Sequence, residues 1–152
     1  MDVKMVNPFI DAVFDVMPQL GFQKAERVGL KVKDSNLAND GVMVLIGITG
    51  AVKGNVVYNL DMEDAKKTAS TMMMGMPVAE LDDMAQSAIS ELGNMLAANA
   101  SIKIANAGIE MHISPPTLLY GKEASLKVAV EKVLAVDMLV DSIPLEINIA
   151  LD

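Results

Sequence analysis

The order of helical and β-type segments is the feature that most constrains the fold of this chain. Each half of the sequence opens with a helical segment and continues into strands. We interpret this as a loose internal duplication of roughly 75 residues. Long antiparallel connections predict an α+β layer fold, with helices packed on a mainly antiparallel β-sheet. No Pro/Ser-rich linker separates the halves, so the whole chain, 1–152, is predicted to form a single domain with one core.

Caps, turns and apolar spacing locate the individual elements. Helices are predicted at 8–20, 62–74 and 79–107, and strands at 25–33, 42–48, 51–60, 109–113, 125–130, 133–140 and 145–151. Pro8 suits the first position of the first helix, and Pro18 predicts a distorted last turn. Asp61 is predicted to cap the second helix. Residues 34–40 are typical of a polar loop, and 49–50 and 141–144 of hairpin turns.

Composition excludes several classes of site and partner. The chain has no cysteine, which rules out disulfides, thiolate catalysis and cysteine-ligated zinc. The single histidine, His112, lies in an alternating segment near Glu110, so it is either a solvent-facing strand residue or a satisfied core histidine. A net charge of −8 disfavours nucleic acid and anionic membranes as partners. We interpret most of the 13 methionines as core residues.

The hydrophobic segments do not predict a membrane protein. They are short and interrupted by charges or glycines, and none approaches the roughly 20 residues that a spanning helix needs. Acidic residues within the first apolar stretch also argue against a secretory signal. We therefore expect a cytoplasmic protein with no membrane partner.

Ser87, Glu91 and Asn94 are predicted to lie on one face of the long third helix. Glu91 and Asn94 are about 60° apart around the axis and roughly 4.5 Å apart along it, so a carboxylate and a carboxamide lie side by side. Ser87 precedes Glu91 by one turn. Gly93 adds little bulk beside the pair, so we expect Ser87 and Gly93 to contact a partner. The spacing alone is weak evidence for a functional site, because exposed Glu and Asn side chains usually only face solvent.

The surrounding sequence resembles the signature of the CheC/CheX/FliY family of chemotaxis phosphatases. That signature has Asp or Ser, Glu four residues later, Asn three residues after the Glu, and a proline a little over twenty residues further on. Ser87, Glu91, Asn94 and the pair Pro115 and Pro116 fill these places, with the proline about one position early. The predicted order of helices and strands is similar to that of the family over nearly the whole chain.

The first half lacks a complete copy of this motif. The CheC branch of the family carries the motif twice, once in each half. Here Asp11 and Asp15 stand at the first two places, but Pro18 stands where Asn is expected. Proline has no side-chain amide with which to orient water. One motif in the second half is typical of CheX-like members, which this chain resembles most closely.

The resemblance implies that the chain accelerates hydrolysis of the aspartyl phosphate of a CheY-like receiver domain in chemotaxis signalling. It implies that Asn94 orients the attacking water and that Glu91 docks on the lysine of the receiver. Ser87 either contacts the partner or bonds a local backbone carbonyl. Asn99 and Asn106 face elsewhere and are given no catalytic part. Mg²⁺ belongs to the receiver, so the chain is expected to have no cofactor or metal of its own.

Two further expectations concern assembly and alternative functions. CheX-like proteins resemble one another in forming homodimers through the sheet, and the alternating apolar residues of the C-terminal strands predict an edge that pairs with a second copy. The same helix face would also suit a non-catalytic module that binds a receiver or a flagellar-switch protein. A metal hydrolase is disfavoured, because the acidic pairs at 63–64 and 82–83 are typical of helix starts.

Overall fold

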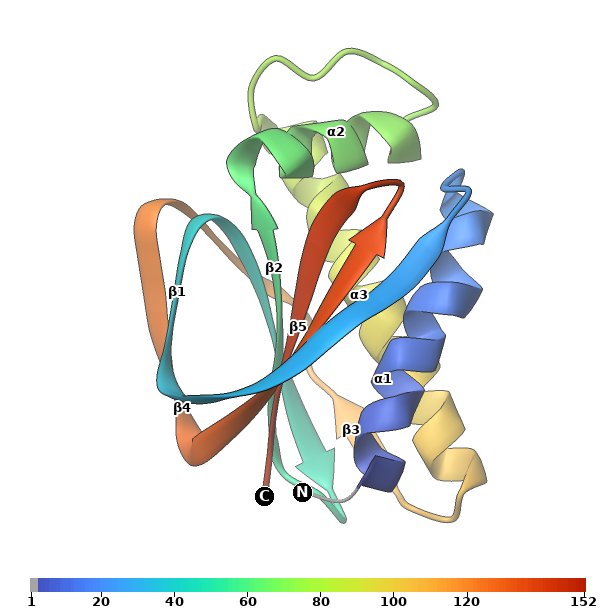
Figure 1. Ribbon diagram of the computed structural model, residues 1–152, viewed down its shortest axis with the longest axis vertical. Helices are drawn as coiled ribbons and strands as arrows, with labels where there is room; N and C mark the ends of the chain where they lie inside the picture. The colour runs from blue at the N-terminus through green and yellow to red at the C-terminus, as the bar shows by residue number, and fades with distance from the viewer. Residues whose placement is uncertain (1–2) are drawn as a thin grey trace.

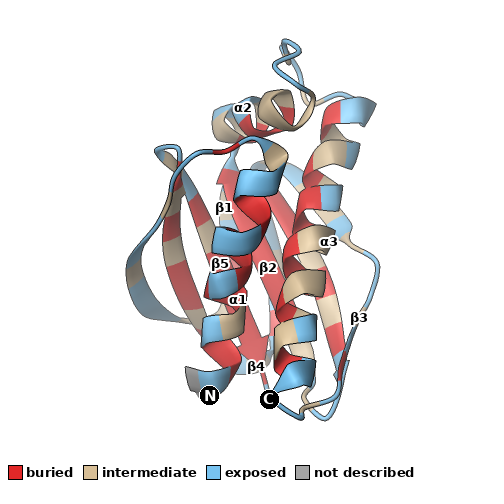
Figure 2. Ribbon diagram, turned by 90° about the vertical axis from the view of Figure 1, so that its right-hand side faces the viewer, coloured by how far each residue is buried: buried red, intermediate tan, exposed pale blue. Residues whose placement is uncertain are grey.

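The computed structural model describes residues 3–152, so residues 1 and 2 of the predicted domain lie outside the described part. The elements are α1 (Val3–Val16), a 3₁₀ turn (Met17–Leu20), β1 (Ala25–Gly50), β2 (Gly54–Asp61), α2 (Met62–Met72), α3 (Asp83–Asn106), β3 (Met111–Ile113), β4 (Thr117–Val140) and β5 (Ile143–Leu151). Helices α1 and α3 lie side by side on one face of an antiparallel sheet (Figures 1 and 2), which confirms the predicted α+β fold class.

The long strands β1 and β4 each occupy two places in the sheet. Residues 25–34 of β1 pair with 132–140 of β4, and residues 41–45 of β1 pair with 117–121 of β4. Strand β2 lies between the later part of β1 and β5, and β5 also pairs with the end of β4. The strand order is unchanged when β1 and β2 are exchanged with β4 and β5. This pseudo-symmetry supports the predicted internal duplication.

The predicted polar loop at 34–40 is wrong, because this segment continues strand β1. Residues 36–39 pair with 124–127 of β4, between two shifts in register. Leu37 is 1% exposed and packs in a second apolar cluster on the helix-free face of the sheet, with Met43, Val57, Val128, Val133 and Ala150. Pairing with a distant strand therefore outweighs the local polar composition. The same pairing merges the predicted strands at 125–130 and 133–140 into β4.

The helix starts also differ from the predicted ones. Helix α1 already includes Val3, so Pro8 lies inside it and leaves one helical hydrogen bond unmade. The distorted turn predicted at Pro18 is confirmed as the 3₁₀ turn. Asp61 precedes α2 but its side chain makes no capping hydrogen bond. Helix α3 starts at Asp83 rather than near residue 79, because the Asp82 carboxylate caps it.

The structure moves the first predicted hairpin turn, confirms the last one and places His112 in solvent. The first turn lies at 51–53 rather than at 49–50, since β1 extends to Gly50. The last hairpin does turn at Asp141 and Ser142, which adopt left-handed φ values of 49° and 69°. His112 is exposed, with its Nε2 2.8 Å from Glu110 Oε1, so it is the solvent-facing strand residue.

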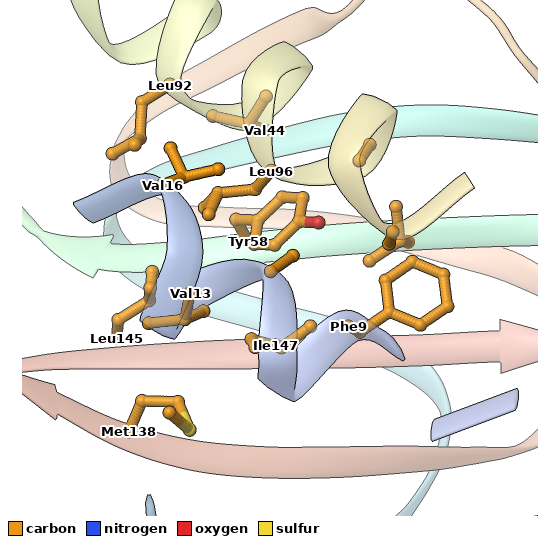
Figure 3. Packing of buried hydrophobic residues seen from close by; sticks show 14 of the residues in the cluster. Phe9, Val13, Val16, Val44, Tyr58, Leu92, Leu96, Met138, Leu145 and Ile147 are labelled. Atoms are coloured by element: carbon orange, nitrogen blue, oxygen red, sulfur yellow. The ribbon is translucent and has the colours of Figure 1, made fainter. Parts of the chain in front are cut away.

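The main apolar core lies between the sheet and helices α1 and α3. Both halves of the chain contribute to it, and Figure 3 shows side chains from both helices meeting those of the strands: Phe9, Val13, Val16, Val44, Tyr58, Leu92, Leu96, Met138, Leu145 and Ile147. This core fixes α3 against the sheet along the helix. Within residues 3–152, no helix combines the length and the hydropathy that a membrane span requires.

Candidate functional site on the outer face of α3

Helix α3 presents the predicted site residues on its outer face. Its inner face is buried against the sheet and α1 through Ile89, Leu92 and Leu96. Ser87 and Glu91 are exposed and Asn94 is half-buried on the opposite side. The three residues therefore share one face of a rigid helix, as their spacing predicts. The Asp82 side chain stabilises the start of this helix by accepting a hydrogen bond of 2.9 Å from the backbone N–H of Ala85.

Gly93 does not belong to this outer face, and the prediction that it makes room for a partner is wrong. Gly93 is buried, and a Cβ atom there would lie 2.5 Å from Val44 Cγ1 and 3.2 Å from Val44 Cβ on strand β1. The missing side chain instead allows α3 to approach the sheet closely. Gly93 thus positions Glu91 and Asn94 indirectly, by setting the height of their helix above β1.

A shallow groove joins the start of α3 to the start of β4. It is lined by Asp83, Gln86, Ser87, Ser90, Glu91, Pro116 and Leu118. The fold therefore brings the proline of the predicted signature next to Ser87 and Glu91, whereas Asn94 lies outside the groove in the next turn. The Gln86 side chain also donates to the Tyr120 hydroxyl at 3.4 Å. Leu118 and Tyr120 were missed in the sequence, because only the pairing of β4 with the end of β1 places them here.

The three predicted site residues differ from Gln86 beside them, whose side chain has hydrogen-bond partners. Within the described part of the chain, the Glu91 carboxylate, the Ser87 hydroxyl and the Asn94 carboxamide make no side-chain hydrogen bond or ion pair. Ser101, further along the same helix, instead donates to the carbonyl of Ala98 at 3.1 Å. Ser87 makes no such bond to a local carbonyl within residues 3–152. All three groups are free to bind groups of another molecule.

The corresponding positions of the first helix cannot form the same constellation. Asp11 and Asp15 are exposed on α1, and Pro18 lies in the 3₁₀ turn after the helix. No carboxamide stands where Asn94 stands in the second half. The other two asparagines of α3 also lie off the site: Asn106 is at the last position of the helix, and the Oδ1 atom of Asn99 is buried.

A second polar cluster lies on the helix-free face of the sheet. The Glu146 carboxylate accepts hydrogen bonds from Lys33 Nζ at 2.6 Å and Asn59 Nδ2 at 2.9 Å, and it lies 3.1 Å from Lys31 Nζ. Burial alone would raise the pKa of Glu146, but the hydrogen bonds from Lys33 and Lys31 outweigh it and lower that pKa. The charges in this cluster are therefore paired with one another: Glu146 forms ion pairs with Lys31 and Lys33. Across residues 3–152, no group of three or more His, Asp or Glu side chains is arranged to hold a metal ion.

Comparisons of sequence and comparisons of structure with known proteins point to the same family. The family model described as "Chemotaxis phosphatase CheX" matches residues 42–138, which include Glu91 and Asn94. The chain is 36% identical over 128 residues to the CheY-P phosphatase CheX of Thermotoga maritima, covering 84% of this chain and 82% of that protein.

Solved structures show the same fold over nearly the full length. A CheC-like superfamily protein from Shewanella sp. PV-4 superposes with a TM-score of 0.88 at 21% identity, covering 100% of this chain and 99% of that chain. A CheX–CheY–BeF₃–Mg²⁺ complex from Borrelia burgdorferi gives a TM-score of 0.75 at 26% identity, covering 97% of each chain.

Proposed function

This chain belongs to the CheX family of chemotaxis phosphatases, and from that premise we propose that it accelerates hydrolysis of the aspartyl phosphate of a CheY-like receiver domain. The observation that carries the proposal is the outer face of α3. There Ser87, Glu91 and Asn94 project from a helix that is capped, buried along its other side and seated closely on the sheet. Their polar groups have no partner within the described chain and are available to another protein.

Asn94 is proposed to orient the attacking water. The phosphorylated receiver supplies its own Mg²⁺ and lysine around the aspartyl phosphate, so the phosphatase needs only to place a water in line with the phosphorus and hold it there. A carboxamide both donates and accepts hydrogen bonds and carries no charge that would repel the phosphoryl group. A single positioned group of this kind typically contributes about 10²–10³ in rate.

Glu91 is proposed to dock the helix through the active-site lysine of the receiver. Its exposed carboxylate lies within one turn of Asn94, so an ion pair there would place the carboxamide next to the phosphoryl group. Ser87 extends the same contact by one turn. This arrangement lets a chain with a net charge of −8 recognise an active site through one well-placed charge pair.

We also propose that the protein is a cytoplasmic homodimer, formed through the first part of β1 rather than through the C-terminal strands that the sequence predicts. The C-terminal strand β5 is central, because β2 and β4 flank it, so it is not an edge. Of the outer strands, the β3–β4 edge is interrupted by Pro115 and Pro116, which lack an N–H for pairing. Residues 25–34 of β1 form the other edge and carry exposed apolar side chains: Val28, Leu30 and Val32.

Analytical ultracentrifugation tests this assembly. The native protein is expected to sediment at about twice its 16.2 kDa chain mass, and Val32→Lys is expected to shift it to the monomer by placing a charge in the paired edge. A monomeric native protein at micromolar concentration would contradict the proposal.

Matched asparagine variants test the proposed catalytic role. Phosphate release from a phosphorylated CheY-like receiver is measured with Asn94→Ala and with Asn106→Ala, which removes an exposed amide from the same helix. Asn94→Ala is expected to lower kcat by about 10²–10³, while it still binds the beryllofluoride-activated receiver. Asn106→Ala is expected to match the native protein. Binding without any acceleration by the native protein would instead favour the non-catalytic binding module.

A further inference from the structure

Three methionines near the start of α3 expose their side chains to solvent. Met74 is 97% exposed, Met76 53% and Met84 60%. Met74 and Met76 lie in the α2–α3 loop, which projects beyond the N-terminal end of α3 (Figure 2), and Met84 lies in the first turn of that helix. We refer to these three residues as the methionine rim. Three exposed methionines within eleven positions of the sequence are more than the scattered single apolar side chains that a protein surface normally carries.

The loop holds Met74 outward in an unfavourable backbone conformation. Met74 has a left-handed φ of 61°, which bulky side chains rarely adopt. The turn is tied to the end of α2, since the N–H of Met74 donates to the carbonyl of Thr71 at 3.2 Å and that of Gly75 to Ser70 at 2.8 Å. The most exposed apolar side chain is therefore held in place by a strained, hydrogen-bonded turn. A left-handed residue is a common way to end a helix and is usually glycine, so here the end of α2 fixes the place of an exposed methionine.

The rim continues the proposed site along the same helix face. Met84 precedes Glu91 by seven residues, or two turns, so the two side chains lie on one face about 10 Å apart along the axis. A standard interface covers about 800 Å² of each partner and so extends roughly 16 Å from its centre. A receiver domain centred on Glu91 and Asn94 would therefore cover Met84 and reach the adjoining loop.

We propose that the methionine rim is a second, apolar contact for the same receiver domain, an inference that rests on the proposed function. Its flexible thioether side chains can adapt to an irregular surface, so the rim supplies affinity while Asn94 acts on the phosphoryl group. Continuity with the Glu91 face favours the receiver over a second copy of the chain. The proposed dimer edge lies on another element, residues 25–34 of β1.

Serine and leucine substitutions test this contact. In the triple serine variant, Met74, Met76 and Met84 are each changed to Ser; in the matched leucine variant, each is changed to Leu. Phe14→Ser is the control, because Phe14 is also an exposed apolar side chain, at 42%, but lies on α1, outside the site helix and outside the proposed dimer edge. For each protein we would measure the Kd for the beryllofluoride-activated receiver, and KM and kcat for phosphate release. The serine variant is expected to raise Kd and KM about tenfold with kcat unchanged, and the other two to match the native protein.

Three other results are possible, and they distinguish a failure of the rim contact from a failure of the proposed function. A serine variant with native Kd and KM, in a protein that is otherwise active, would overturn the rim contact and leave the phosphatase intact. A serine variant that changes only the sedimenting mass would assign the rim to a second copy, which also overturns it. If the native protein neither binds the receiver nor hydrolyses its phosphate, the proposed function fails and the rim contact fails with it.

Discussion

Substituting Gly93 by alanine tests how the site helix is seated. In an exposed helix this change stabilises by about 1 kcal/mol, because alanine has the higher helix propensity. Here the new Cβ would lie 2.5 Å from Val44 Cγ1, which is about 1 Å closer than ordinary contact. Val44 is a buried, β-branched strand residue, 2% exposed, so it cannot rotate away freely. Overpacking of this kind costs about 1–3 kcal/mol, so after the gain in helix propensity is subtracted we expect a net destabilisation of up to about 2 kcal/mol.

Urea denaturation followed by circular dichroism measures this change in the free energy of unfolding. In a thermal unfolding experiment on a chain of this length, each 1 kcal/mol lost from the free energy of unfolding lowers Tm by about 2–4 °C. Adding Val44→Ala removes the clashing methyl groups, so the double variant is expected to be more stable than the sum of the two single changes predicts. Raising α3 would also move Glu91 and Asn94 and lower kcat. A Gly93→Ala protein that is more stable than the native one would refute the close approach of α3 to β1.

Three other predictions concern the cap, the polar cluster and the docking charge. Asp82→Ala is expected to lower the free energy of unfolding by about 1 kcal/mol, measured by thermal unfolding, because the N–H of Ala85 loses its acceptor, whereas Asp82→Asn is expected to retain most of it. Because the pKa of Glu146 is lowered in the folded state, its contribution to stability is complete above the unfolded pKa and is lost as the pH falls through the folded value. Glu146→Gln is therefore expected to lower the urea midpoint at neutral pH and to differ little from the native protein in strong acid; an equal loss at both pH values would contradict this. Glu91→Gln is expected to raise KM and to weaken its dependence on ionic strength, measured by phosphate release over a salt series.

Local patterns in the sequence predict the site helix well. Glu91 and Asn94 share a face because helical geometry depends only on their spacing, and the flanking Leu92 and Leu96 are buried as the apolar periodicity requires. The apolar pattern predicts too early a start for α3, since that pattern extends before the Asp82 cap. Boundaries depend on such individual hydrogen bonds more than on periodicity.

The role of Gly93 could have been found from the sequence. Gly93, Ala97 and Ala100 follow one another at spacings of four and three, which places three small residues on one strip of the helix. The structure buries all three. A strip of small residues on the side away from Glu91 indicates close approach to the protein's own sheet rather than to a partner.

Non-local pairing accounts for the features that the sequence could not reveal. Residues 36–39 are strand only because 124–127 lie beside them, almost ninety positions later in the chain. Strands β1 and β4 pair with each other at both of their ends. This pairing places β5 in the centre of the sheet and leaves residues 25–34 as an edge. It also brings Pro116 and Leu118 to the groove beside Glu91. Local propensity carries no information about which distant strand supplies the hydrogen bonds.

The most direct test of the phosphatase assignment is the lifetime of the aspartyl phosphate on a CheY-like receiver in the presence of a small, substoichiometric amount of the native protein. We expect the whole receiver pool to lose its phosphate faster than by its own hydrolysis, through repeated turnover of each phosphatase molecule. An unchanged lifetime, with receiver binding shown in the same preparation, would contradict it.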